Sequence, residues 1–599
     1  MAPLNKPSKT TAPWEITSAT ASVSTKQLSR KSKQTFSPSN HMKTKTLLTT
    51  CALSASLLST PQGHAKELIH DADHYVLKAQ HAEQWAKDDK AVDSKLAEFK
   101  KSNNGKPPNI FYILIDDMGY GDMGIPELNS IRGYSTANVN KFSDQAMRLN
   151  RMYTEPSCTP TRCAFMTGRQ PYRYGMGDTA VDISGFGLPA KEVTLAEVLS
   201  EAGYATTHIG KWHMGDIKEA WPNHQGFDYA AFPIHQQGQL TIFNDDASKE
   251  GVAVSIGPGQ YKETFTKDKW FRPDGSAMAV GVEGKKGENV REVGMKPGER
   301  WTEAKYDELN QRYQDQAVEH LRKLAKQDKP FFLQYWPIIP LSAPRHTTEI
   351  YNTPNGGTYT EKMELLDRWI GDLMKEMDDL GVADNTIVII MGDNGHFTKY
   401  SPQSGYTPMI FKGGKGYTTE GGVRVDAFVR WPGMIAADSI VADIFNVSDF
   451  YTTLARLAGA MDKLPTDRLI DGVDQSALLL EGETKGRRDT VYIYSGNKME
   501  AIVKEHLKLK VPEPGENAIL ASFYDLQRDT REENPVSTEI GAWGGAEFTR
   551  IIQRHMMRKK KYPDEPAAFG KPYEGIDNLR PETKAAVEAF LIKSKVHEQ

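Results

Sequence analysis

The residues best suited to chemistry are two acidic pairs, each standing after a run typical of a buried strand. Asp116 and Asp117 directly follow the run NIFYILI. Asp393 and Asn394 follow the run TIVIIM and a single glycine. One such pair commonly makes only a turn or a helix cap. Two pairs offer three carboxylates and an amide oxygen, which are hard ligands suited to Ca²⁺ or Mg²⁺ rather than to zinc.

A third candidate is Cys158, which opens the segment CTPTRCAFMTGR. Pro160 favours the first turn of a helix and Gly168 its end, so Cys158 is predicted to lie at a helix N-terminus, where backbone N–H groups favour an anion. With three cysteines in 599 residues, a disulfide framework is excluded. Two plainer interpretations remain open: a disulfide between Cys158 and Cys163, or two buried thiols. Neither explains why proline and arginine stand two and four positions after Cys158.

Alternating strand and helix patterns predict the fold that positions these residues. Short continuous apolar runs are typical of strands buried on both faces, and the helical segments between them end at glycines. The expected strands are 109–115, 204–209, 331–336, 386–391 and 428–431, and the expected helices are 193–202, 313–326 and 362–380. This alternation predicts an α/β fold with a mostly parallel central sheet flanked by helices. Ligands bind beyond the carboxyl ends of such strands, so the acidic pairs are expected to converge there.

The N-terminal 65 residues have the features of a leader. A stretch rich in Ser, Thr and Pro is predicted to be disordered. From Met42, which we expect to be the natural start, lysines precede a short apolar run and small residues. This order is typical of a secretory signal peptide, here cut after Ala65, and the run is too short to span a bilayer. A disordered tail on a cytosolic enzyme is the alternative.

The rest of the chain divides by composition. Residues 66–106 are charged and rich in alanine, which predicts a helix and a polar linker. We expect a catalytic domain over 107–484 and a smaller C-terminal α+β domain over 485–599. Within the latter, 530–575 is expected to be rich in loops, and a last helix is expected to start near Pro581.

The charge balance limits the partners. Lysine and arginine number 74 against 78 aspartates and glutamates, so the formal net charge of −4 gives no overall attraction to nucleic acid or membrane. The basic run 558–561 is predicted to be a solvated helix face. We therefore expect no nucleic-acid partner and no stable membrane insertion.

The segment beginning at Cys158 resembles the sulfatase signature Cys-x-Pro-x-Arg, whose cysteine is oxidised to Cα-formylglycine. Further landmarks follow in that family's order: KPPNIFYILIDDMGYGD, TLAEVLSEAGYATTHIGKWHMG, KPFFLQYW, MGDNG and GGKGYTTEGGVRV. The resemblance extends from about 107 to 440 and returns at 523–526 (FYDL) and Asp529. It implies an alkaline-phosphatase-like fold and hydrolysis of sulfate esters of the arylsulfatase type.

The resemblance also implies a role for each matching residue. The cation, Ca²⁺ rather than Mg²⁺, would be held by Asp116, Asp117, Cys158 in its modified form, Asp393 and Asn394. Arg162 would hydrogen-bond the formylglycine side chain. Lys211, His213 and Lys415 would contact the sulfate.

The implied reaction suits a sulfate ester, which is a poor electrophile carrying negative charge. One hydroxyl of the aldehyde hydrate attacks sulfur while the cation and lysines neutralise oxygen charge. Loss of a proton from the second hydroxyl then expels sulfate, whereas an unmodified cysteine or serine would stall at the sulfated stage. A protonated lysine or histidine must also protonate the leaving oxygen.

One departure from the family pattern concerns that proton donor. Sulfatases commonly have Pro-His after the PFFL strand, whereas this chain has Pro340 and Leu341. His346 lies five residues further on and is a candidate substitute. The identity of the general acid is therefore left open.

Three functions are compatible with the sequence. Hydrolysis of sulfate esters is favoured, with a sulfated small molecule or polysaccharide as substrate and a formylglycine-generating enzyme as maturation partner. A phosphate or phosphonate ester hydrolase of the same fold would have a similar site. A catalytically silent, calcium-dependent carbohydrate-binding protein is the third, supported by Leu341. The leader predicts an exported protein, periplasmic or secreted.

Overall fold

The computed structural model describes eight stretches of the chain: residues 67–180, 185–234, 281–293, 302–340, 358–396, 410–512, 522–536 and 544–571. All of them belong to one compact unit, Ala65–Gln599. The predicted leader, Leu341, His346 and the helix expected from Pro581 lie outside the described residues.

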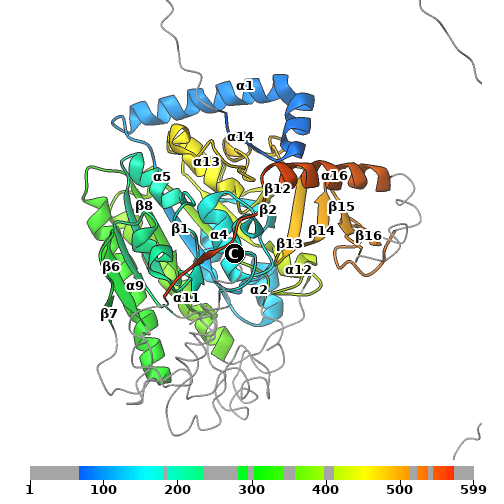
Figure 1. The fold of residues 1–599 in the computed structure, drawn as a ribbon. Coiled ribbons are helices and arrows are strands. Elements are labelled where there is room, and N and C mark those ends of the chain that lie inside the picture. The colour runs from blue at the N-terminus through cyan, green and yellow to red at the C-terminus, as the bar shows by residue number, and fades with distance from the viewer. Residues whose placement is uncertain are drawn as a thin grey trace, which may run out of the picture. The chain divides into compact units, whose positions relative to one another are not determined.

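A large mixed sheet forms the centre of this unit (Figure 1). Its strands are β1 (Asn109–Ile115), β2 (Met147–Tyr153), β4 (Ala205–Gly210), β5 (Tyr229–Phe232), β6 (Val282–Lys285), β7 (Arg291–Glu292), β8 (Phe331–Trp336), β9 (Thr386–Gly392), β10 (Arg424–Val425), β11 (Ala427–Arg430) and β12 (Ser439–Asn446). They lie in the order β10-β2-β11-β9-β1-β8-β4-β5-β6-β7, and β12 pairs with β2. The central strands β9-β1-β8-β4-β5 are parallel, which confirms the predicted sheet, and antiparallel strands extend it at both edges.

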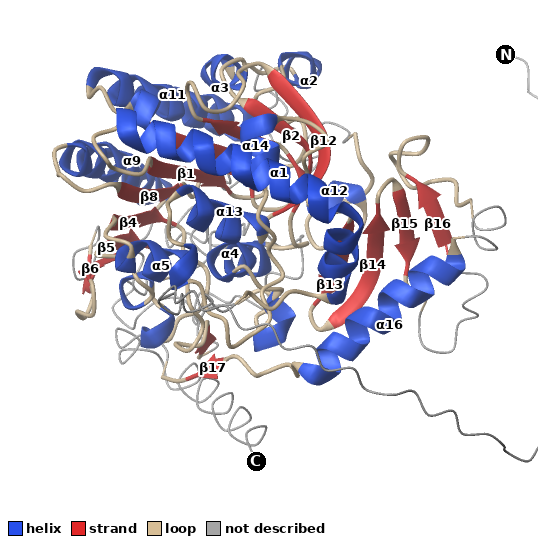
Figure 2. Cartoon of the chain, turned by 90° about the horizontal axis from the view of Figure 1, so that it is seen from above, coloured by secondary structure: helices blue, strands red, loops and turns tan. Residues whose placement is uncertain are grey.

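Both faces of this sheet are buried because its central strands are apolar on both sides. On β1, Ile110 and Tyr112 enter one core while Phe111 and Ile113 enter the other. The first core is covered by α4 (Cys158–Thr167), α5 (Leu195–Glu201) and α13 (Asp449–Leu457), and the second by α3 (Ala137–Ser143), α9 (Glu303–Ala325) and α11 (Thr358–Asp379). Figure 2 shows these two helical layers on opposite sides of the strands.

The smaller C-terminal domain is an antiparallel sheet covered by one helix (Figure 2). Its elements are β13 (Thr490–Ser495), β14 (Lys498–Lys504), β15 (Leu507–Lys510), β16 (Ser522–Asp525) and α16 (Gly545–Lys561). Phe548 and Ile551 of α16 pack against Ile502, Leu509 and Phe523 of the sheet. The remaining described elements include α1 (Ala72–Ser102), α2 (Pro126–Arg132), α12 (Glu420–Val423), α14 (Ser476–Glu481) and the pair β3 (Phe186–Gly187) and β17 (Ala568–Phe569).

The expectation that 530–575 is rich in loops is wrong, because α16 occupies its centre. Phe548, Ile551 and His555 recur at helical spacing and are buried. The spacing was hidden by the polar and basic residues around them. The basic run 558–561 forms the last turn of this helix. Helix α9 also starts ten residues earlier than predicted, where the Thr302 side chain accepts a hydrogen bond from the Lys305 N–H (3.3 Å).

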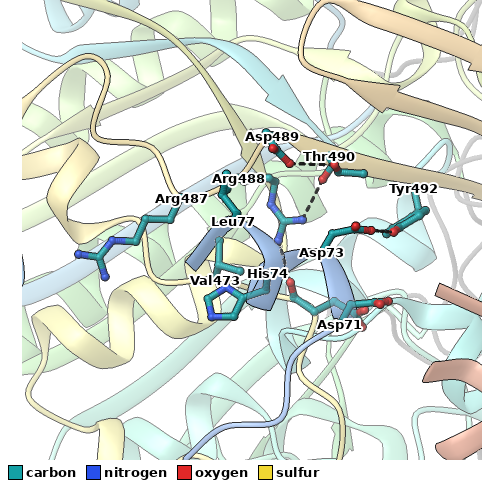
Figure 3. A pocket seen from close by; sticks show the side chains of 11 residues that line it. Asp71, Asp73, His74, Leu77, Val473, Arg487, Arg488, Asp489, Thr490 and Tyr492 are labelled. Atoms are coloured by element: carbon teal, nitrogen blue, oxygen red, sulfur yellow. Dashed lines mark hydrogen bonds between the residues drawn. The ribbon is translucent and has the colours of Figure 1, made fainter. Parts of the chain in front are cut away.

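A small pocket lies at the start of α1, where that helix meets β13 (Figure 3). The acids that line it are already paired. Asp71 is 2.6 Å from His555 Nδ1, and Asp73 accepts hydrogen bonds from Tyr492 and Arg554. These contacts connect the start of α1 to the C-terminal domain. Among the described helices, none is long and apolar enough to cross a membrane.

Candidate active site

The carboxyl ends of two neighbouring strands bring the acidic pairs together, as predicted. Strands β1 and β9 are parallel and in register, with Ile115 opposite Gly392. The residues that follow them therefore begin at the same edge of the sheet. The Asp117 N–H donates a hydrogen bond to Asp393 Oδ1 (2.9 Å), and the Asp393 N–H donates to the Ile115 carbonyl (3.1 Å).

Cys158 is the first residue of α4, and that helix ends at Gly168 with φ +66°, both as predicted from the sequence. The side chain is completely buried, and its Sγ lies 3.6 Å from Asp117 Oδ1. Cys163 lies one and a half turns further on, in the core beneath the sheet. Both are free thiols, so the disulfide interpretation is wrong for this structure.

Four buried side chains form a cluster with the ligand chemistry of a cation site. One ligand atom each from Asp116, Asp117, Cys158 and Asp393 lies within 4.8 Å of all the others. Asn394 joins them by donating from Nδ2 to Asp117 Oδ1 (2.9 Å). Asn394 Oδ1 and Asp116 Oδ2 are buried without a hydrogen-bond partner in the described part of the chain. Since unpartnered buried oxygens are costly, these residues fit a hard cation such as Ca²⁺ or Mg²⁺.

Arg162 holds two of these acids. Its Nη2 donates to Asp116 Oδ1 and to Asp393 Oδ2, both at 2.8 Å, and its Nη1 donates to the Lys211 carbonyl (2.9 Å). Its guanidinium carbon is 4.9 Å from the centre of the Trp336 ring. The side-chain hydrogen bonds of Arg162 thus go to two of the acids that surround Cys158 and to the Lys211 carbonyl rather than to the cysteine itself.

Lys211 and Lys415 approach the cluster on different acids. Lys211 Nζ is 2.6 Å from Asp116 Oδ1, and Lys415 Nζ is 2.8 Å from Asp117 Oδ1. The three bases Arg162, Lys211 and Lys415 match the three acids in charge. A bound divalent cation would leave the cluster with an excess of positive charge, which favours an anionic ligand.

His213 also lies at this site, in a left-handed backbone conformation with φ +59°. Its Nε2 is 2.8 Å from the Ala180 carbonyl, which can only accept, so Nε2 carries the proton. Its Nδ1 is buried and has no hydrogen-bond partner in the portion of the chain that is described. Burial and the charge of Lys211 lower the pKa of His213 well below its usual range, so the ring is neutral.

The surroundings of Asp116 and Asp393 shift the pKa values of these two acids in opposite directions. Burial raises the pKa of Asp116, but the charges of Lys211, Lys415 and Arg162 outweigh it and hold that pKa well below its usual range. Burial and the neighbouring Asp116 raise the pKa of Asp393. Burial, together with both acids, also raises the pKa of the Cys158 thiol well above its usual range. Because the thiolate is the reactive form, an unmodified Cys158 is a poor nucleophile here.

Sequence reasoning missed His396, which directly follows the MGDNG run. Its Nδ1 lies 2.7 Å from Asp122 Oδ2, and its carbonyl accepts a hydrogen bond from the Lys415 N–H (2.7 Å). The ring leaves no room for a side chain at Gly119, where a Cβ would come within 2.4 Å of it. The sequence feature that could have pointed to it is its place two residues after the predicted metal-binding pair Asp393 and Asn394.

Comparison with known proteins identifies the class. The family model described as Sulfatase matches residues 108–460, which is more than half of the 599 residues. The chain therefore belongs to the sulfatase family and is a sulfuric ester hydrolase.

Individual relatives agree with this assignment. The chain is 28% identical over 505 residues to mouse N-acetylgalactosamine-6-sulfatase, covering 77% of this chain and 88% of the relative. It is 34% identical over 399 residues to human arylsulfatase A, covering 65% and 71%. The crystal structure of the PsFucS1 sulfatase from Pseudoalteromonas sp. superimposes with a TM-score of 0.70 at 28% identity, covering 80% of this chain and 96% of that one.

Proposed function

We propose that this sulfatase cleaves sulfate esters with an oxygen nucleophile made from Cys158, assisted by a divalent cation. The observation that carries the proposal is the convergence of two strand ends on the first residue of α4. That convergence places a buried cysteine among three carboxylates and three basic side chains. A structural cysteine in a core has no need of such surroundings.

The proposed cation ligands are Asp116, Asp117, Asp393, Asn394 and the modified side chain of residue 158. All four unmodified ligands offer oxygen, which favours Ca²⁺ and also permits Mg²⁺. When bound, the cation supplies positive charge against the oxygens of the sulfate group.

The basic residues are proposed to bind and orient the ester. Lys211 forms an ion pair with Asp116, and Lys415 forms one with Asp117. Their ammonium groups can therefore bind sulfate oxygens from two directions. Arg162 fixes Asp116 and Asp393 through a fork of hydrogen bonds and keeps them from repelling each other. His213 presents a bare Nδ1, so it accepts a hydrogen bond from a hydroxyl group rather than donating one.

Conversion of Cys158 to Cα-formylglycine is proposed to require a maturation enzyme that acts before folding is complete. The sulfur is completely buried at the start of α4, so another enzyme's active site cannot reach it in the folded chain. The modified residue supplies an aldehyde whose hydrate is an oxygen nucleophile.

The decisive experiment measures, by mass spectrometry, the mass of the peptide that carries residue 158 in protein purified from its native host. Loss of the sulfur and gain of an aldehyde are the expected result. An unmodified thiol in protein from that host would contradict the proposal. Protein made in a host without the maturation enzyme serves as the matched control and should retain the thiol.

A pair of chromogenic esters separates the competing functions. Turnover of an aryl sulfate well above that of the matching aryl phosphate is expected. The reverse preference would favour a phosphate or phosphonate ester hydrolase. Cation binding without turnover of either ester, in protein that carries the aldehyde, would favour a carbohydrate-binding protein.

The chain is further proposed to be exported and to act on a sulfated small molecule or polysaccharide. Support comes from the leader, in which lysines after Met42 precede a short apolar run and small residues before Ala65. Sequencing the N-terminus of the native protein tests this, with Lys66 as the expected first residue. An N-terminus at or before Met42 in the native protein would contradict export by this signal.

A further inference from the structure

The position of Lys415 is set by the loop that carries it, residues 410–423, here called the Lys415 loop. On its inner side this loop bonds to the backbone of the active site. The Lys415 N–H donates to the His396 carbonyl and the Gly416 N–H donates to the Pro156 carbonyl, both at 2.7 Å. The Lys415 loop is thus in contact with the segments that precede Cys158 and follow Asp393.

On its outer side the same loop bonds to the C-terminal domain. Arg531 Nη1 donates to the Ile410 carbonyl, Lys412 Nζ donates to the Glu532 carbonyl, and Thr418 Oγ1 donates to Glu500 Oε2, each at 3.2 Å. These contacts span the loop on both sides of Lys415. The C-terminal domain therefore forms the outer support of a loop whose inner side borders the sulfatase site.

A buried ionic cluster also joins the Lys415 loop to the C-terminal domain. Lys508 of β15 is 2% exposed, and its Nζ lies 3.1 Å from Glu420 Oε1 and 3.0 Å from Glu532 Oε1. Glu532 Oε2 accepts a hydrogen bond from the Glu420 N–H (2.6 Å), and Tyr153 OH donates to Glu420 Oε2 (3.0 Å). Buried charges of this kind are stable only while their partners are in place.

Glu532 itself has a strained backbone with φ +54°, a conformation that non-glycine residues adopt only where the surroundings enforce it. Two glycines that follow Glu420 pack closely against the residues on either side of Lys415. A Cβ on Gly422 would lie 1.9 Å from the Tyr417 carbonyl, and one on Gly421 would lie 2.3 Å from the Lys412 carbonyl. With so little free space, a displacement of Glu420 must displace Lys415 as well.

We propose that Lys508 and Glu532 are positioning residues of the sulfate site, through which the C-terminal domain holds the Lys415 loop against Asp117. The proposal rests on the assignment of Lys415 to sulfate binding. It makes the C-terminal domain a working part of the active site rather than a separate module.

The kinetic test uses the full-length, matured enzyme with Lys508→Met, which keeps most of the length of the side chain and removes its charge. We expect kcat/KM for an aryl sulfate to fall about 10- to 100-fold, as displaced positioning groups cause. The inhibition constant for inorganic sulfate should rise as well. Lys508→Arg should restore most of the activity. The matched control is Lys504→Met, which removes an ion pair with Asp489 in the same sheet, away from the loop.

A double-mutant cycle separates positioning from general support. Once Lys415→Ala has removed the ammonium group, Lys508→Met should lower kcat/KM by less than about 2-fold further, because coupled residues are not additive. A full, independent loss in that background would overturn the proposal.

Hydrogen exchange provides a readout that does not depend on activity. The amides of Lys415 and Gly416 should exchange at least about 10-fold faster in Lys508→Met than in the wild type, since local opening sets their protection. If Lys508→Met does not fold, Glu532→Gln replaces it, because an amide oxygen can still accept from the Glu420 N–H. Unchanged exchange in a folded variant would overturn the proposal. Faster exchange in Lys508→Met, together with a wild type that does not hydrolyse aryl sulfates, would instead reject the proposed function alone.

Discussion

At the level of single residues, the acidic and basic side chains of the site pair with one another. Asp116 and Asp117 are paired with Lys211 and Lys415, while Asp393 shares Arg162 with Asp116. Two oxygens in this cluster, Asp116 Oδ2 and Asn394 Oδ1, have no partner among the described residues. A cation would satisfy both and would also lower the raised pKa of Asp393.

Removal of the cation is therefore expected to destabilise the fold as well as to stop turnover. Dialysis against a chelator should lower the Tm, because a ligand at 100 times its Kd contributes about 3 kcal/mol. Adding Ca²⁺ should restore the Tm, and Mg²⁺ should restore it less. Asp116→Asn is the matched control, since its Tm should respond less to added Ca²⁺. An identical response in both proteins would place the cation elsewhere.

At the scale of elements, the position of Cys158 depends on how α4 ends. Gly168 closes the helix with φ +66°, and a Cβ there would lie 2.4 Å from the Tyr451 ring. Its carbonyl also accepts hydrogen bonds from the Asp471 and Gly472 N–H groups, both at 2.8 Å. The helix that presents Cys158 is thus fixed at its far end by packing on α13.

Gly168→Ala is expected to destabilise the protein by about 2–4 kcal/mol, which combines the strain of a left-handed alanine with a collision in a packed core. Gly203→Ala is the matched control. Gly203 follows the end of α5 with φ +93°, and a Cβ there would meet open space. Only the strain of a left-handed alanine, about 1–2 kcal/mol, is therefore expected. Thermal melts of both variants measure the difference. Equal losses would show that contact with Tyr451 contributes nothing.

At the scale of the whole described unit, the segment before α1 ties the core to the C-terminal domain. Asp71 caps α1, is 2.6 Å from His555 Nδ1 of α16, and accepts from Arg173 (3.3 Å). His70 lies beside it with its Nδ1 3.0 Å from the Ile470 carbonyl. Burial is the main cause that lowers the pKa of His70 from 6.5 to about 4.

This buried histidine predicts a loss of stability in mild acid. Between pH 6.5 and 4 the unfolded chain binds a proton at His70 that the folded chain does not, so stability falls as the pH decreases through this window. The loss amounts to about 3 kcal/mol. His70→Asn should keep a donor for the Ile470 carbonyl and reduce this slope. His81→Asn, an exposed position on α1, should leave it unchanged. Denaturant unfolding across this pH range tests both.

Particular elements show how far the fold could be predicted from the sequence. β1 and β8 were predicted with the bounds that the structure shows, because their continuous apolar runs are buried on both faces. β2 and β12 were not foreseen, since their side chains are a mixture of buried and partly exposed. α16 was missed because three buried residues, Phe548, Ile551 and His555, stand among charged ones.

Local runs and motif spacing were enough to predict the family and the parallel centre of the sheet. They also predicted most of the residues that meet at the candidate site, although not His396. The contacts of those residues, in contrast, follow from the folded chain. Asp116 and Asp393 are 277 positions apart in numbering, and their shared contact with Arg162 exists only through strand register. The ionic support of the Lys415 loop by Lys508 and Glu532 likewise has no local signature. Such contacts join distant segments, and their geometry follows from packing rather than from neighbouring sequence.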